Sequence, residues 1–132
     1  MEIINPLVSQ GRNIRSPLQS LAADPDRIFA TCGQMLLDLV HHVEQQPGPA
    51  VVAYFNFKLS TLRLRAQNRG THTHVQVLVD WPDFAPLPDG LPQAHFRVRV
   101  MRSGKHLSEE TRTPEAKVAA EIIARALAEQ AT

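Results

Sequence analysis

Residues 51–66 of the chain read VVAYFNFKLSTLRLRA, and the spacing of their apolar side chains decides the fold. In the first half of this stretch every odd position is apolar, whereas in the second half Leu62, Leu64 and Ala66 occupy even positions. Successive side chains of a strand point to opposite faces, so this change of parity requires a turn or a bulge near residues 58–61. We favour a turn, which divides the stretch into two strands.

Two further strands are expected downstream. Residues 71–81 (THTHVQVLVDW) alternate with a period of two and direct Val75, Val77 and Val79 inward. After a proline-rich loop at 82–92, residues 95–100 alternate in the same way. A polar stretch then leads to Thr113. Consecutive strands with short links indicate an antiparallel sheet.

Two amphipathic helices flank these strands. Asp24-Pro25-Asp26 has the residue types of a helix start, and an apolar stripe from Ile28 to Val43 follows it. Thr113-Pro114-Glu115 starts a second helix whose stripe includes Ile123. The sequence therefore predicts an α+β fold with a helix, an antiparallel sheet of about four strands and a second helix. Both helices should cover one sheet face and leave the other face open.

Residues 1–23 are expected to form an extended or partly disordered arm, and residues 24–132 a single domain. The apolar arm residues Ile3, Ile4, Leu7 and Val8 suit an edge strand, on this domain or on a partner, and we expect a homo-oligomer. Cys32 is the single cysteine, and no apolar run is long enough for a membrane helix. These features favour a soluble, cytoplasmic protein that does not contact a membrane.

The charge distribution is more informative than the net charge of +1. There is no Asp or Glu between residues 45 and 79 or between residues 91 and 108. Strand parity assigns a set of cationic and aromatic side chains to the open sheet face as a nucleic-acid or anion-binding site. The set is Tyr54, Lys58, Arg63, Arg65, His72, His74, His95, Arg97 and Arg99.

A cationic face whose single acid is Asp80 at the end of a strand predicts an anionic partner, because like charges on neighbouring strands repel each other. The favoured function is a small non-enzymatic binding protein for single-stranded or structured nucleic acid, whose phosphates Arg and Lys neutralise. The alternative is a protein-interaction module, such as a dimeric chaperone or adaptor, that grips a partner with the open sheet and the arm. No catalytic residue and no cofactor is assigned.

A third hypothesis concerns the histidines. His72 and His74 point to one face, and together with His95 and Asp80 they would suit Zn²⁺ or another borderline metal. A metal-activated water would then make the protein a hydrolase. No HExxH or other spaced metal motif accompanies these residues, so no metal ligand is assigned.

If the parity change is a bulge, three strands lie between two helices, and the architecture resembles a double-stranded-RNA-binding domain. The alanine-rich segment 115–120 (EAKVAA) is similar to the last helix of that family. The resemblance covers about the final third of the chain and implies RNA binding. Pro114-Glu115 stands where the family has its phosphate-binding lysine pair.

Overall fold

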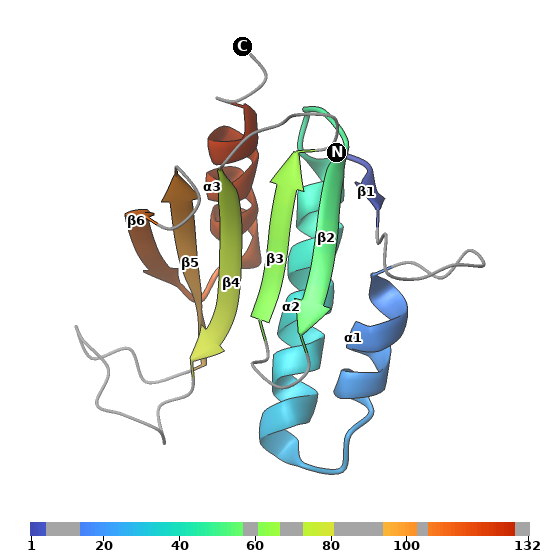
Figure 1. The fold of residues 1–132 in the computed structure, drawn as a ribbon. Helices are drawn as coiled ribbons and strands as arrows, with labels where there is room; N and C mark the ends of the chain where they lie inside the picture. Colours follow the sequence, from blue (N-terminus) through green and yellow to red (C-terminus); the bar gives the residue numbers. More distant parts are fainter. Residues whose placement is uncertain (5–13, 57–60, 67–72, 81–93, 103–105, 129–132) are drawn as a thin grey trace.

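The computed structural model describes residues 1–4, 14–56, 61–66, 73–80, 94–102 and 106–128. They form an α+β fold of three helices and a six-stranded mixed sheet (Figure 1). The helices are α1 (Arg15–Ala22), α2 (Arg27–Gln45) and α3 (Ala116–Ala128). The strands are β1 (Ile3–Ile4), β2 (Val51–Asn56), β3 (Thr61–Ala66), β4 (His74–Asp80), β5 (His95–Arg102) and β6 (His106–Thr113).

The six strands lie in the sheet in the order in which they occur in the chain. Strand β1 pairs parallel to β2, and all other neighbours pair antiparallel. Asn56 at the end of β2 lies opposite Thr61 at the start of β3, so the parity change separates two antiparallel strands, as predicted. The alternative of a bulge in a three-stranded sheet is therefore wrong, and with it the double-stranded-RNA-binding architecture.

The sheet has six strands instead of the expected four or so, because an additional strand lies at each edge. Strand β6 occupies the polar stretch before Thr113, which was not predicted to be a strand because it has no run of apolar residues. An edge strand needs no such run, since natural proteins commonly place charges on exposed edges. At the other edge, Ile3 and Ile4 pair with Val51 and Val52, so they dock on this domain.

The expected arm also contains a helix that the sequence pattern did not reveal. Residues 15–22 form α1 and not an extended segment, and Leu18 and Leu21 are buried in the core. The apolar residues of such a short helix cover only two turns, so their periodicity is hard to recognise. Leu7 and Val8 lie outside the described residues.

Helix α2 begins slightly later than its sequence signal suggested. Asp26, and not Asp24, is the N-cap, and its carboxylate accepts hydrogen bonds from the backbone N–H groups of Ile28 (2.8 Å) and Phe29 (3.4 Å). At the start of α3 the hydroxyl of Thr113 accepts a hydrogen bond from the N–H of Glu115 at 3.1 Å. Both helix starts thus use the acidic or hydroxyl side chains that the sequence offers there.

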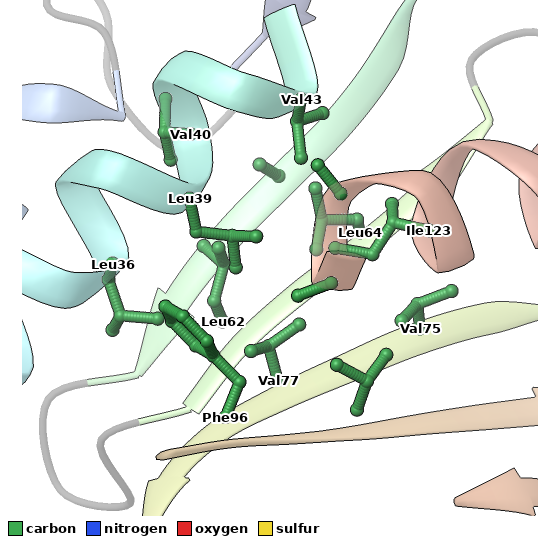
Figure 2. Close-up of a cluster of buried hydrophobic side chains, with 14 of the residues drawn as sticks. Leu36, Leu39, Val40, Val43, Leu62, Leu64, Val75, Val77, Phe96 and Ile123 are labelled. Atoms are coloured by element: carbon green, nitrogen blue, oxygen red, sulfur yellow. The ribbon is translucent and has the colours of Figure 1, made fainter. Parts of the chain in front are cut away.

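Helices α2 and α3 pack on the same face of the sheet, as predicted, and form the main core with it (Figures 1 and 2). The labelled core residues come from α2, the three strands β3, β4 and β5, and α3: Leu36, Leu39, Val40, Val43, Leu62, Leu64, Val75, Val77, Phe96 and Ile123. Burial of each such side chain contributes about 1.5–3 kcal/mol. None of the described helices covers the opposite face, which we call the open face.

Cys32 on α2 is buried in the hydrophobic core. Burial raises the pKa of its thiol to about 11, so the thiol stays protonated at neutral pH. Cys32 therefore fills space and is not a reactive nucleophile. Among the described helices, none combines the length and the apolar character needed to cross a membrane.

Gly33 allows α1 and α2 to pack closely. A Cβ atom at this position would lie 2.3 Å from the backbone nitrogen of Ala22 and 2.8 Å from the Cα atom of the same residue. These neighbours are backbone atoms at the end of α1, so a side-chain rotation cannot relieve the clash. The position of α1 on the domain therefore depends on the absence of a side chain at Gly33.

We expect Gly33→Ala to destabilise the protein by about 1–3 kcal/mol, because α1 must move away from α2. At an unconstrained helical position Gly→Ala stabilises a protein by about 1 kcal/mol. The sign of the change in unfolding free energy therefore tells whether Gly33 is needed for the packing of α1 on α2. Urea unfolding followed by circular dichroism measures it. The control is Gln34→Ala at the exposed neighbouring position, which should change stability by less than about 0.5 kcal/mol. A higher unfolding midpoint for Gly33→Ala would contradict the packing described.

Candidate functional site

The pairing of the strands brings the predicted arginines to one face. Arg63 lies opposite Gln76, and Gln76 lies opposite Arg99 on the next strand. Paired residues of an antiparallel sheet share a face, and residues two apart along one strand do as well. Arg63, Arg65, Arg97 and Arg99 therefore all lie on the open face, which confirms the parity prediction.

The arginines of β5 already have acidic partners, contrary to the expectation that Asp80 is the single acid of this face and leaves its cations unpaired. Arg97 Nε lies 3.1 Å from Asp80 Oδ2, and Arg99 Nε lies 3.3 Å from Glu110 Oε1. Both Nε atoms are buried and form no hydrogen bond within the described residues, so the attraction to the carboxylates is electrostatic. Asp80 was expected on this face, whereas Glu110 was missed because it belongs to β6, which was not predicted to be a strand.

A third arginine joins this group from β6. Arg112 Nη1 donates a hydrogen bond to Asp80 Oδ2 at 2.6 Å, so Asp80 attracts arginines from both β5 and β6. The group, which we call the β4–β6 network, consists of Asp80, His95, Arg97, Arg99, Glu110 and Arg112. Its charges are largely compensated within the protein, and its arginines are therefore weaker candidates for an external anion.

His95 does not contribute to a binding surface, although its parity is that of the open face. Its side chain is 0% exposed, and its Nε2 atom lies 3.1 Å from Arg112 Nη1. Because a guanidinium is only a donor, Nε2 accepts this hydrogen bond. The prediction that His95 contacts an anion is therefore wrong, because the neighbouring groups bury it.

The strand register also separates the histidines of the metal hypothesis. His95 lies opposite Asp80 at one end of the β4–β5 pair, whereas His74 lies opposite Met101 toward the other end. Six residues of strand separate the two positions, which is about 20 Å. His74 and His95 therefore do not bind one ion. His72 lies outside the described residues, among which no group of three or more metal-ligating side chains occurs.

The other half of the open face has uncompensated positive charge. We call Tyr54, Arg63, Arg65, His74 and Gln76 the β2–β4 patch. Arg63 and Arg65 are exposed, and neither forms an ion pair with a carboxylate in the described part of the chain. Lys58, which was predicted to join them, lies outside the described residues. The charge available to a ligand is therefore concentrated on β3.

Tyr54 and Arg65 are held against each other within the patch. Arg65 Nη2 donates a hydrogen bond to the Tyr54 hydroxyl at 3.2 Å, and its guanidinium carbon lies 5.9 Å from the centroid of the ring. This distance is within the range of a cation–π contact. The guanidinium of Arg65 thus lies over the ring of Tyr54 on the open face.

His74 lies near the same arginines but carries no charge at neutral pH. Partial burial and the positive charge of Arg63 both lower the pKa of its imidazole below the ordinary value of 6.5. Its Nε2 atom lies 3.5 Å from the amide nitrogen of Gln76. At pH 7 His74 is therefore a neutral hydrogen-bonding group and not, as the sequence suggested, a substitute for a cation.

Two residues that shape this face, Glu110 and Arg112, were missed by the sequence analysis. The signal was present in the alternation of Glu110 and Arg112 with the β-branched residues Thr111 and Thr113. An alternation of charged residues with threonines is typical of an edge strand. Recognition of this edge strand would have placed Glu110 beside the arginines of β5.

A comparison of the chain with protein-family models, curated proteins and solved structures found no match.

We expect Asp80→Asn to destabilise the protein by about 1–3 kcal/mol, because Arg97 and Arg112 lose the carboxylate that both face. Unfolding in urea at pH 7 measures the change. The matched control is Glu109→Gln, which removes an acid from a more exposed ion pair with Arg102 at 3.5 Å. That change should cost less than about 0.5 kcal/mol. Equal losses in the two variants would show that the β4–β6 network has no special structural role.

Proposed function

We propose that this chain is a small non-enzymatic binding protein for nucleic acid and that it contacts phosphates with the β2–β4 patch. The supporting observation is that Arg63 and Arg65 are exposed on an uncovered sheet face and form no ion pair with a described carboxylate. Arginine is well suited to phosphate because its planar guanidinium forms two parallel hydrogen bonds.

The ion pairs reduce the set of candidate contacts that the sequence suggested. Arg97 and Arg99 would have to leave Asp80 and Glu110 before they could bind a phosphate fully. The exchange of a carboxylate for a phosphate adds little binding free energy, since one ion pair replaces another. Arg63 and Arg65 have no such competitor among the described carboxylates, so we assign the main phosphate contacts to them, with Tyr54 and Gln76 beside them.

The test is the salt dependence of oligonucleotide affinity. Wild-type protein should bind a labelled random-sequence oligonucleotide with roughly micromolar affinity at about 50 mM salt and weaken steeply toward about 200 mM. Replacement of Arg63 and Arg65 together by Gln should reduce the slope of log affinity against log salt by about 1.4–1.8, the loss of two phosphate contacts. Fluorescence anisotropy measures both quantities.

A matched control removes the same charge elsewhere. Lys117 and Arg125 are exposed on α3, which packs on the covered face of the sheet. Their joint replacement by Gln should leave the slope nearly unchanged. If both double variants lose the same slope, the attraction follows net charge and not the β2–β4 patch. No binding by the wild-type protein at low salt would overturn the proposal.

One observation favours the alternative of a protein-interaction module. Leu107 on the edge strand β6 is 45% exposed and lies opposite Met101, which gives the open face a small apolar area. Partner proteins often pair with an exposed sheet edge of this kind. Apolar association of that sort is insensitive to salt, so the same titration separates the two functions.

A further inference from the structure

The β2–β4 patch combines a stacking surface with phosphate-binding charge. Tyr54 lies opposite Arg63, and Arg63 lies opposite Gln76, so these side chains form one row across three neighbouring strands. Neighbouring strands are about 4.8 Å apart, which makes the row about 10 Å long. Along this row an aromatic ring, a cation and an amide follow one another on the same face.

From this arrangement we propose that the preferred ligand is single-stranded nucleic acid, with a base stacked against Tyr54 and adjacent phosphates on Arg63 and Arg65. The inference rests on the proposed function and specifies its ligand. Arg65 supports it directly, because its hydrogen bond to the Tyr54 hydroxyl holds the ring in place beside the guanidinium. Aromatic rings and guanidinium groups both stack on bases, so the pair offers a base two groups that already contact each other.

The shape of the sheet disfavours a duplex as the preferred ligand. Six strands spaced at about 4.8 Å give a face about 24 Å wide, whereas the major groove of a duplex is about 12 Å wide. The open face as a whole therefore does not enter a groove. Bases of a duplex are also paired and stacked on one another, so Tyr54 has no free base to stack on. In a single strand the bases are available, and each stacked base strengthens binding by a factor of about 5 to 150.

Gln76 fits the same arrangement. Its amide carries both donors and an acceptor and lies next to Arg63 in the row, close to the neutral imidazole of His74. These groups can hydrogen-bond the edge of a base whose face is stacked on Tyr54. A duplex hides the Watson–Crick edges of its bases in its base pairs, whereas a single strand exposes them.

The experiment compares three labelled probes of equal length by anisotropy at about 50 mM salt: a single strand, a hairpin duplex and an abasic strand. The abasic strand keeps the phosphates but has no bases to stack. We expect the single strand to bind at least about fivefold more tightly than either of the other two. This comparison uses the unmodified protein and so does not depend on the folding of a variant.

Two substitutions then locate the stacking surface. Tyr54→Leu should weaken single-strand binding by a factor of about 5 or more and leave abasic-strand binding nearly unchanged, whereas Tyr54→Phe keeps the ring and should retain single-strand affinity within about threefold. Equal or tighter binding of the duplex, or an equal effect of Tyr54→Leu on all three probes, overturns this inference while the proposed function stands. Absence of binding to every probe overturns the proposed function itself.

Discussion

The packing of α2 and α3 on one face of the sheet is the constraint on which the rest of the structure depends. Once Leu64, Val75 and Val98 are buried under the helices, the period of two leaves their neighbours no choice of face. Arg63, Arg65 and Arg99 are therefore directed to the open face by the burial of other residues. The burial of the core residues thus determines which side chains lie on the open face. A slip of one residue in a central strand would move its apolar side chains to the open face and its polar side chains into the core.

Electrostatics then divide the open face into two halves with different roles. On the β4–β6 side Asp80 and Glu110 compensate the arginines, and the buried ring of His95 accepts a hydrogen bond from Arg112. On the β2–β4 side Arg63 and Arg65 have no such partners among the described residues. We interpret the first half as a network of ion pairs that stabilises the pairing of the edge strand β6 with the sheet. The second half is the surface that is available to an anion.

The sequence predicted the parts of the fold that depend on apolar periodicity. The shared face of α2 and α3, the division of the first strand stretch into the antiparallel strands β2 and β3 and the common face of the arginines all follow from alternation with periods of 3.6 or two. Strand β6 and helix α1 were missed because one is polar and the other is short. The omission of β6 from the prediction affected the predicted site. This strand supplies Glu110, which lowers the positive charge of the open face. His95 was misplaced for a related reason: parity gives the side of a sheet, but burial depends on neighbours in space.

The central claim is that an anionic ligand occupies the β2–β4 patch and not the β4–β6 network. Backbone amide chemical shifts in a titration of isotope-labelled protein with a short single-stranded oligonucleotide test it most directly. The account predicts shifts at Tyr54, Arg63, Arg65 and Gln76 that saturate together and decrease with added salt, with small changes in the described part of β6 and in α3. Shifts centred on β6, or no shift anywhere at low salt, would contradict it.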